Sequence, residues 1–413
     1  MKILLLPSYY YPEGVSSPYI SRNRNERFAD EGWDMVVYTP TPSRGISESL
    51  CKEYSKKEHR RESYLNGHII VNRFPLLSEK KSPIIRAVRY FVQNLKQFNR
   101  AVFCSEARQC DMMLIASTPP TQGAMAALVK KIRHIPFVYN LQDVFPDSMV
   151  GAGLAKEGGL LWKIGRLIED FTYRNADKII VISEDFKKNI LQKGVPEEKI
   201  EVIYNWVESD IVKPVAKRFN PLFDEFSLNR DQFTIVYAGN FGNAQNINII
   251  VDAAVALPNI QFALFGTGGI EKEIRNRIVS GSIKNVHLIP FQPYNRVGLV
   301  YSVGDACVVS CKPGLGGSAM PSKTWNIMSC GRPVIASFDD GEMKQIIEKN
   351  ECGVFTQAGN LDEFVNAIKS LSEDRPRCDK MGDNARRFIM NNLTKEIGTQ
   401  KYVDVINSLI NRQ

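Results

Sequence analysis

Short, continuous apolar runs alternate with longer amphipathic segments along almost the whole chain. Seven runs lie in the first half, at residues 1–7, 34–40, 68–75, 111–118, 135–143, 178–183 and 200–205. Six more follow, at residues 233–240, 260–266, 285–290, 306–310, 332–337 and 352–356. Apolar strands without alternating polar positions, joined by helices, are typical of parallel sheets that helices cover on both faces. The pattern therefore predicts an α/β protein with two doubly wound, Rossmann-like sheets.

A segment without clear periodicity, residues 208–232, separates the two series of strands. We interpret it as a linker between an N-terminal domain, residues 1–207, and a C-terminal domain, residues 233–385, which face each other across a cleft. Residues 386–413 are predicted to form a C-terminal helix that packs back on the N-terminal domain. Sheets of this kind bind ligands at the carboxyl ends of their strands, so the loops after the strands are the informative segments.

Composition narrows the class of protein only a little. The chain has 413 residues, of which 44% are hydrophobic and 24% charged, and its net charge of +8 suits anionic partners. We expect no nucleic acid partner. Four histidines without an HExxH motif give little material for a zinc site, so no metal site is predicted. The eight cysteines form no CxxC pair, and Pro7 interrupts the first apolar run too early for a signal peptide, so we expect a cytoplasmic protein.

A lysine occupies an unfavourable electrostatic position near residue 320. Pro321-Ser322 predicts the start of a helix, and Gly331 predicts its end. Lys323 therefore falls in the first turn, where the helix dipole disfavours a cation by ~0.3–1 kcal/mol. An exposed lysine could extend into water at little cost. The alternative is that an anion binds at the same end of the helix.

Four local motifs follow one another in the chain. They are "YYYPEGVSSPYISRNRNERFADEGWDMVVYTP" from Tyr9, "VISEDFKKNILQKGVPEEKIEVIYNWVESD" from Val181, "YAGNFGNAQNINIIVDAA" from Tyr237 and "AMPSKTWNIMSCGRPVIAS" from Ala319. With the two-sheet layout, this ordered set resembles the family-4 glycosyltransferases of GT-B fold, and most of all their WbuB-like bacterial branch, which builds surface polysaccharides. The resemblance implies a retaining hexosyltransferase, without metal or cofactor, that moves a sugar from a nucleotide diphosphate, usually UDP, to an acceptor held by the N-terminal domain.

The resemblance also implies a set of donor-binding residues. They are Gly14, Asn205, Asn240, Gln245, Gly266, Phe291, Gln292, Ser322, Lys323 and Asn326. Family members commonly have Arg and Lys where this chain has the neutral amides of Asn240 and Gln245, so Lys323 is the candidate to balance the donor diphosphate. Asn326 stands where a glutamate usually accepts hydrogen bonds from the donor ribose, and Ser318 stands where the same motif begins.

The last two residues of the apolar run at 135–143, Gln142 and Asp143, are candidates for catalysis. A carboxylate at the end of a strand could orient an acceptor hydroxyl or accept its proton. Asp143 could equally cap the following turn. Many family members have histidine at the position of Gln142, which we expect near the reacting face of the sugar. A single carboxylate without a partner on the opposite face favours front-face retention over double displacement.

The stretch from Lys80 to Arg100 has six basic residues and no acidic one. Its apolar side chains fall on one helical stripe, and most of its basic ones fall elsewhere; the stripe is Ile84, Val88, Phe91, Leu95 and Phe98. This is typical of a basic amphipathic helix on an anionic membrane, or of a helix that packs on the core with a solvated face. Because similar enzymes use polyprenyl-diphosphate-linked sugars, we expect a lipid-linked oligosaccharide acceptor and peripheral contact with the inner face of the plasma membrane. The expected contact residues are Arg86, Arg89, Phe91 and Lys96.

Two alternatives remain open. The first is a non-catalytic nucleotide-sugar-binding or lipid-binding subunit on the same scaffold, which the missing Arg, Lys, histidine and glutamate favour. The second is a UDP-sugar 2-epimerase of the same fold, which would need further carboxylates and histidines for which this chain has few candidates.

Overall fold

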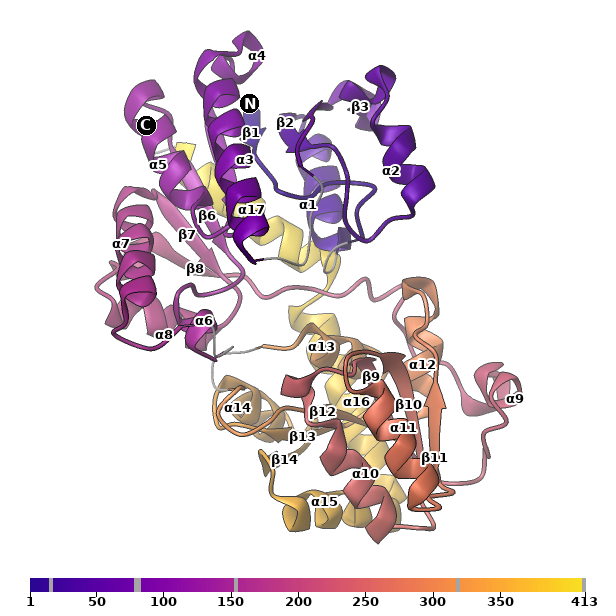
Figure 1. Ribbon diagram of the computed structural model, residues 1–413. Coiled ribbons are helices and arrows are strands. Elements are labelled where there is room, and N and C mark those ends of the chain that lie inside the picture. The colour runs from indigo at the N-terminus through magenta and orange to yellow at the C-terminus, as the bar shows by residue number, and fades with distance from the viewer. Residues whose placement is uncertain (15–17, 78–82, 152–154, 317–319, 411–413) are drawn as a thin grey trace. The chain divides into compact units, whose positions relative to one another are not determined.

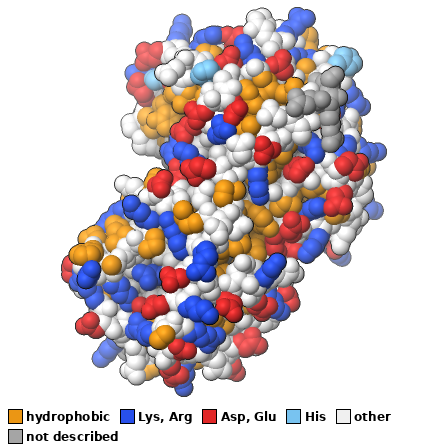
Figure 2. All heavy atoms as spheres, turned by 180° about the vertical axis from the view of Figure 1, so that it is seen from behind, with side chains coloured by type: hydrophobic (Ala, Val, Ile, Leu, Met, Phe, Trp, Pro, Cys, Tyr) orange, Lys and Arg blue, Asp and Glu red, His pale blue; other side chains and the backbone are white. Residues whose placement is uncertain are grey.

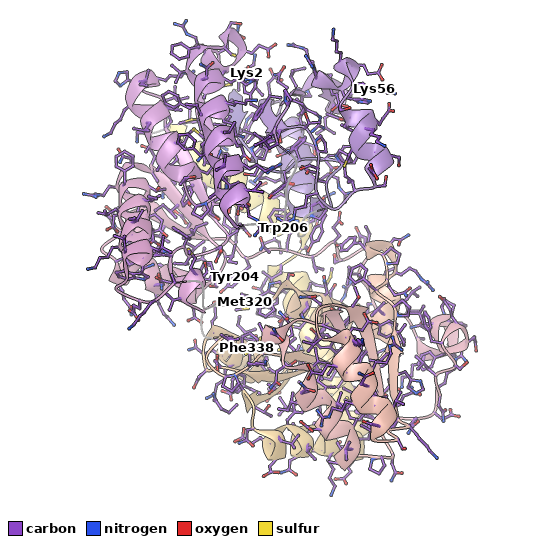
Figure 3. All side chains as sticks on the ribbon, viewed as in Figure 1. Lys2, Lys56, Tyr204, Trp206, Met320 and Phe338 are labelled. Atoms are coloured by element: carbon purple, nitrogen blue, oxygen red, sulfur yellow. The ribbon has the colours of Figure 1, made fainter. Side chains whose placement is uncertain are left out.

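The computed structural model describes residues 1–14, 18–77, 83–151, 155–316 and 320–410 (Figure 1). The chain divides into two compact units: unit 1 is Met1–Tyr204 with Thr399–Gln413, and unit 2 is Asn205–Gly398. Figure 3 labels Tyr204 and Trp206, which stand on either side of the first boundary. Each unit has its own mainly parallel sheet with covering helices, so the predicted fold class is confirmed.

Unit 1 contains an eight-stranded sheet in the order β3-β4-β2-β1-β5-β6-β7-β8. Within the described residues, every pairing is parallel except that of β3 with β4. The short polar edge strand β3 is the one strand that the hydrophobic pattern did not predict. The strands are β1 (Lys2–Leu5), β2 (Asp34–Pro40), β3 (Arg61–Tyr64), β4 (Ile69–Phe74), β5 (Met112–Ala116), β6 (Phe137–Leu141), β7 (Lys178–Val181) and β8 (Ile200–Val202).

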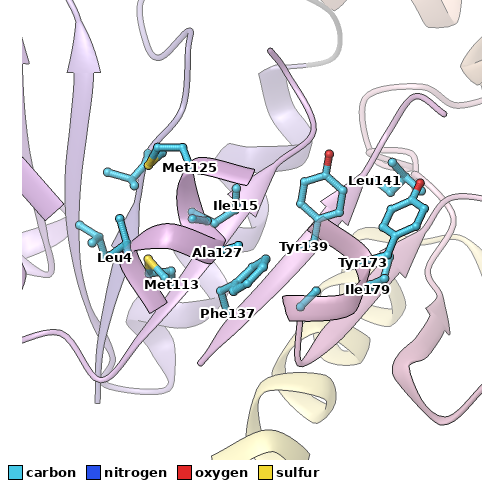
Figure 4. Packing of buried hydrophobic residues seen from close by; sticks show 14 of the residues in the cluster. Leu4, Met113, Ile115, Met125, Ala127, Phe137, Tyr139, Leu141, Tyr173 and Ile179 are labelled. Carbon is cyan, nitrogen blue, oxygen red and sulfur yellow. The ribbon is translucent and has the colours of Figure 1, made fainter. Parts of the chain in front are cut away.

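The helices of unit 1 cover both faces of this sheet. They are α1 (Pro18–Asp30), α2 (Glu48–Tyr54), α3 (Pro83–Phe103), α4 (Ser105–Arg108), α5 (Gln122–Arg133), α6 (Asp147–Gly151), α7 (Leu160–Asn175), α8 (Glu184–Gln192) and α17 (Lys395–Ile410). Helix α5 packs against both α3 and α7, so these three lie side by side on one face, while α1 and α17 lie behind the sheet in Figure 1. Figure 4 shows the core between α5 and the central strands, where Met125 and Ala127 meet Ile115 and Phe137.

Unit 2 contains a six-stranded parallel sheet in the order β11-β10-β9-β12-β13-β14. Its strands are β9 (Thr234–Asn240), β10 (Gln261–Thr267), β11 (Val286–Ile289), β12 (Ala306–Ser310), β13 (Val334–Phe338) and β14 (Gly353–Gln357). Its helices are α9 (Leu222–Glu225), α10 (Ile247–Ala256), α11 (Glu271–Ser280), α12 (Val297–Val303), α13 (Ser322–Ser329), α14 (Glu342–Lys349), α15 (Leu361–Glu373) and α16 (Arg375–Asn392).

The boundaries of the units differ from the predicted ones. The segment 208–232, interpreted as a linker, belongs to unit 2, where Leu222 and Phe223 are buried and the side-chain amide of Asn220 donates to the carbonyl of Leu299 at 2.8 Å. The predicted boundary at 385/386 falls inside α16, and the chain returns to unit 1 only at Thr399. The segment buries apolar side chains but lacks the periodicity of a helix or strand, so its sequence resembles that of a linker.

Helix α17 completes unit 1 by packing on α1. The guanidinium of Arg24 lies 5.7 Å from the centroid of the Tyr402 ring, and Arg27 Nη2 donates to Gln400 Oε1 at 2.8 Å. The predicted return of the C-terminal helix to the N-terminal unit is thus found, beginning thirteen residues later than expected. In the part of the chain that the structure describes, no helix is both long and apolar enough to cross a membrane.

Candidate functional site

The N-terminal turn of α13 lies beside the carboxyl end of β9 in unit 2. Lys323, the second residue of α13, donates from Nζ to the phenolic oxygen of Tyr237 at 3.0 Å, and the same Nζ lies 4.4 Å from the centroid of that ring. The Tyr237 hydroxyl in turn donates to the backbone carbonyl of Asn240 at 2.9 Å. The fully buried Tyr237 therefore connects the lysine to the end of the strand.

The described surroundings of Lys323 do not stabilise its positive charge with an acidic partner, as is usual for a buried cation. Burial lowers the pKa of its ammonium to about 8, and no carboxylate of the described residues opposes this. Position 239 next to the ammonium requires glycine for two reasons. A Cβ there would lie 3.0 Å from Lys323 Nζ, and the backbone φ of Gly239 is +148°, which other residues rarely adopt. A partly buried cation without a counter-ion is the group that a bound anion would stabilise.

Asn240, the last residue of β9, and Gln245, in the loop that follows, both have side chains close to Gly242. A Cβ on Gly242 would lie 2.7 Å from Asn240 Nδ2 and 2.5 Å from Gln245 Oε1. The loop is tied to β12, because Ser310 Oγ donates to the carbonyl of Gln245 at 2.6 Å. Both amides can donate hydrogen bonds at this edge of the sheet, but neither brings charge.

Asn326 lies one turn after Lys323 on α13. Its Oδ1 is buried, and no described group donates a hydrogen bond to it. A buried acceptor without a donor costs about 1–3 kcal/mol, so a ligand hydroxyl at this position would be stabilising. Ser322 is the first residue of the same helix, whereas Ser318 lies outside the described residues.

Three other predicted donor-site residues of unit 2 have different surroundings. Gly266 lies within β10, where a Cβ would be 2.0 Å from the carbonyl oxygen of Gly239, so strand packing alone requires glycine there. Phe291 is 65% exposed after β11 and is free to stack. Gln292 is buried, and its amide is occupied by the Pro290 carbonyl at 3.0 Å and by the Arg296 guanidinium at 2.8 Å.

Gly14 and Asn205 belong to different units. Gly14 belongs to unit 1, where a Cβ would meet the carbonyl of Gly45 at 3.9 Å, an ordinary contact. The geometry within unit 1 therefore does not itself demand glycine at position 14. Asn205 is the first residue of unit 2, beside the buried Trp206.

Asp143 and Gln142 lie in the loop after β6, at the carboxyl edge of the sheet of unit 1. The Asp143 carboxylate is exposed, and its Oδ2 accepts a hydrogen bond from Ser148 Oγ at 3.2 Å. Neighbouring protein displaces enough water to raise the pKa of the Asp143 carboxyl, and the Ser148 hydrogen bond opposes this. Gln142 donates from Nε2 to Asn140 Oδ1 at 2.8 Å.

A buried ionic network holds the chain that follows this loop. Lys193 Nζ lies 2.8 Å from Asp147 Oδ2 and 3.0 Å from Glu169 Oε1, and the Tyr173 hydroxyl donates to Glu169 at 2.6 Å. Burial raises the pKa of Glu169, while Lys193 and Tyr173 oppose the rise. The network joins α6, α7 and the end of α8, so it fixes the chain immediately after Asp143.

Tyr237 is the residue of this site that sequence reasoning missed. It occupies a buried position in a strand that is otherwise aliphatic and small. A tyrosine at such a position needs a partner for its hydroxyl, and this requirement was the available signal.

The predicted membrane residues of α3 divide into two groups. Arg89 is buried, with Nε donating to the Leu77 carbonyl at 2.9 Å and Nη2 to Ser43 Oγ at 3.1 Å, so its prediction as a surface residue is wrong. Arg86 and Phe91 are exposed, and Lys96 Nζ donates to the Pro75 carbonyl at 2.7 Å. The Ile84 side chain lies outside the described ones.

One group of potential metal ligands occurs among the described residues. Glu53, Glu58 and His59 lie close together on the surface of unit 1. Lys56 Nζ already lies 2.6 Å from Glu53 and 3.8 Å from Glu58. The ammonium occupies the position that a cation would take, so we infer no metal site there.

Two family models match the chain. The model of Glycosyltransferase Family 4 matches residues 24–211, and that of Glycosyl transferases group 1 matches residues 219–388. WcaI of Escherichia coli K12, named as a colanic acid biosynthesis glycosyl transferase, is 26% identical over 358 residues, covering 84% of this chain and 86% of that protein. WbjE of Pseudomonas aeruginosa, named as a glycosyltransferase, is 22% identical over 342 residues, covering 82% of each.

Solved structures share the fold over nearly the whole chain. Anabaena HepE in complex with UDP has a TM-score of 0.74 at 18% identity, covering 99% of this chain and all of its own. WaaG, a glycosyltransferase involved in lipopolysaccharide biosynthesis, has a TM-score of 0.68 at 14% identity, covering 98% and 99%. Two parallel-sheet units with these likenesses show the GT-B fold. The two matched family models and the relatives named above are all glycosyltransferases, so the chain is similar to glycosyltransferases over most of its length.

Proposed function

We propose that this chain is a retaining glycosyltransferase that moves a hexose or N-acetylamino sugar from a UDP-sugar to a polyprenyl-diphosphate-linked acceptor. It would act at the cytoplasmic side of the plasma membrane, in assembly of a capsule, O-antigen or exopolysaccharide, and without a resident metal or cofactor. We place it in the WbuB-like branch of family 4. The relative named for colanic acid biosynthesis supports a product at the cell surface.

The observation that carries the proposal is the ammonium of Lys323. It is buried enough to lower its pKa to about 8, lacks a carboxylate among the described residues and lies where a Cβ at position 239 would crowd it, at 3.0 Å. A diphosphate at the end of β9 would receive this charge together with the N–H groups of the α13 N-terminus and the amides of Asn240 and Gln245. The unpartnered Oδ1 of Asn326 would accept from a ribose hydroxyl.

On the acceptor side, Asp143 is the proposed group for the attacking hydroxyl. Its raised pKa makes it a better proton acceptor than an ordinary aspartate, provided that it is ionised at the working pH. Lys323 would stabilise the departing UDP, and one flank of the sugar would remain without a carboxylate, which suits front-face retention. Gln142 would contact the sugar only after releasing Asn140.

The test is transfer by the purified full-length chain, using radiolabelled UDP-sugars and a membrane extract as the source of acceptor. We expect label in the lipid fraction, retention of the donor's anomeric configuration and activity that persists in EDTA. Lys323→Met should nearly abolish transfer and weaken UDP binding without lowering the melting temperature, because the buried ammonium is itself destabilising. Lys272→Met, at the second position of α11 but exposed, is the matched control.

The neutral amides of Asn240 and Gln245 also favour a second candidate, a binding subunit that holds UDP-sugar without turning it over. Saturable UDP binding by the wild-type chain, with no transfer to any membrane acceptor, would support the subunit and contradict the enzyme. Wild-type transfer that survives Lys323→Met would contradict the assigned role of the lysine.

A further inference from the structure

Between Val88 and Gln97, helix α3 has polar residues on its buried side and apolar residues on its exposed side. Three of the residues that it buries recur every four positions and are polar, namely Arg89, Gln93 and Gln97, whereas Ala101 and Val102 are buried near its C-terminal end. They are used internally: Gln93 donates to Ser8 Oγ at 2.7 Å, and Gln97 donates to the Tyr38 carbonyl at 2.9 Å. The opposite side presents Val88, Phe91 and Leu95, of which Phe91 is 69% exposed and Leu95 58%. A helix that packed only to build the core would show the reverse pattern.

The other two helices on this face, α7 and α5, also expose apolar residues, although α5 buries an apolar side as well. Helix α7 buries Glu169, Thr172 and Tyr173, while its exposed residues include Leu160, Leu161, Ile164 and Leu167. Leu160 is 75% exposed and Leu167 66%. Helix α5, packed between the other two, exposes Leu128 and Ile132. We call α3, α5 and α7 the outer helical layer. Ten of the twenty exposed large apolar residues in the described part of the chain lie on it, so they are gathered rather than scattered.

The charge of the outer helical layer is almost entirely positive. Helix α3 has four basic residues, α5 three and α7 three, against two acidic residues, both on α7. Glu169 is buried on Lys193, and Asp170 is paired with Arg166 at 2.7 Å. The whole chain, by contrast, has 53 basic and 45 acidic residues. Figure 2 shows basic and acidic side chains interspersed over the face of the molecule that it draws.

We propose that the outer helical layer is a membrane-docking surface, and that its occupant is the surface of an anionic phospholipid bilayer. Apolar side chains would enter the boundary between head groups and acyl chains, and cations such as Arg86, Lys131 and Lys163 would meet lipid phosphates. A surface that binds another protein would be expected to have a more even mixture of acidic and basic residues than this layer has. The proposal extends the predicted membrane contact from one helix to three. It rests on the proposed function only in one respect, since a lipid-linked acceptor is the reason why the protein would dock on a membrane.

The arrangement of the layer supports a planar occupant. Three helices that lie side by side on one face of a sheet present a broad surface, whereas a single peptide helix would need a groove. Each apolar residue that enters the interface contributes through its buried area, and each basic residue near an anionic surface contributes about 1 kcal/mol. Several weak contributions of this kind give reversible, salt-sensitive binding.

The experiment is cosedimentation of the full-length chain with vesicles of mixed phosphatidylcholine and phosphatidylglycerol, without nucleotide. We expect wild-type binding that falls with salt and is much weaker on phosphatidylcholine alone. The variant F91Q/L95Q/L160Q/L167Q should bind roughly tenfold or more weakly. K131E/K163E should lose the preference for anionic vesicles. All of these side chains are exposed, so the fold should persist, as checked by circular dichroism and melting temperature.

The matched control is V255Q/V279Q, which removes two exposed apolar residues of α10 and α11 in unit 2 and should leave vesicle binding unchanged. Equal vesicle binding by wild type and the four-residue variant would overturn the proposal. So would a loss of self-association in that variant, measured by light scattering, with vesicle binding intact. Transfer by the wild type to a short-chain acceptor in detergent is scored separately: transfer without vesicle binding refutes only the docking surface, and vesicle binding without transfer refutes only the proposed function.

Discussion

The Nζ atom of Lys323 lies 3.0 Å from the phenolic oxygen of Tyr237, and no described carboxylate completes the pair. The lysine is thus held by a neutral hydroxyl and the face of an aromatic ring, in surroundings that lower its pKa to about 8. Protonation of Lys323 and binding of an anion must therefore be coupled, because each stabilises the other.

The affinity for UDP is expected to fall as the pH rises above about 8. In the free protein the ammonium is lost through this range, whereas a bound diphosphate would raise the lysine pKa and retain the proton. Binding should therefore take up protons, and affinity should fall by up to roughly tenfold per pH unit. Titration calorimetry in two buffers of different ionisation enthalpy measures both effects. Lys323→Met should bind weakly at every pH, and a wild-type affinity that is flat up to pH ~9.5 would contradict the coupling.

Tyr237→Phe is expected to weaken UDP binding by roughly three- to tenfold. The substitution removes the acceptor of the Lys323 ammonium and leaves the Asn240 carbonyl without its donor, but it keeps the ring. The loss of the acceptor should also move the pH midpoint of binding to lower pH, which a purely structural role of the tyrosine would not do. Stability should fall by about 1 kcal/mol, measured by urea unfolding. An unchanged pH midpoint of UDP binding would show that Tyr237 does not act on Lys323 in the binding site.

Asp143→Asn is expected to lower kcat by about 10²–10⁴ while UDP affinity stays the same. The carboxyl pKa is already raised by the surrounding protein, so activity should decline on the acid side as the group is protonated. Ser148→Ala removes the hydrogen bond that opposes this rise, and the acid limb of the pH–rate profile should move to higher pH. Retention of most of kcat in Asp143→Asn would leave the residue only the role of capping its turn.

Lys193→Met is expected to destabilise unit 1 by up to about 3–5 kcal/mol, because it leaves the buried Glu169 carboxylate with Arg166 as its remaining cation. The folded-state pKa of Glu169 would rise further above its unfolded value, so the destabilisation should be smaller at acidic pH and larger at pH ~8. Adding Glu169→Gln should recover part of the loss. Lys187→Met breaks an exposed ion pair of α8 with Glu197 and should have no measurable effect on urea unfolding.

The hydrophobic pattern predicted the two sheets well because their strands are continuous apolar runs. All thirteen predicted runs contain a strand, and the missed strand β3 is polar and lies at the edge. The linker was misassigned because segment 208–232 buries residues such as Leu222 and Phe223 in irregular backbone. Periodicity detects regular elements, and it cannot detect burial in a loop.

The candidate site was less predictable, because side-chain pairing across the fold leaves little trace in the sequence. The helix start at Ser322 could be predicted from local signals, and so could the unfavourable position of Lys323. The role of Tyr237 depends on the packing of α13 against β9, which no local pattern contains. Arg89 was misassigned for a related reason: helical spacing predicted an amphipathic helix but not which side would face the sheet.

The return of the chain at Thr399 has a consequence for how the protein is made. Unit 2 is a single stretch of chain and can fold fully while the ribosome is still adding residues, whereas unit 1 lacks α17 until synthesis has passed Ile410. The unit that is begun first is therefore finished last. In the meantime Arg24 and Arg27 of the nascent chain lack their contacts with Tyr402 and Gln400.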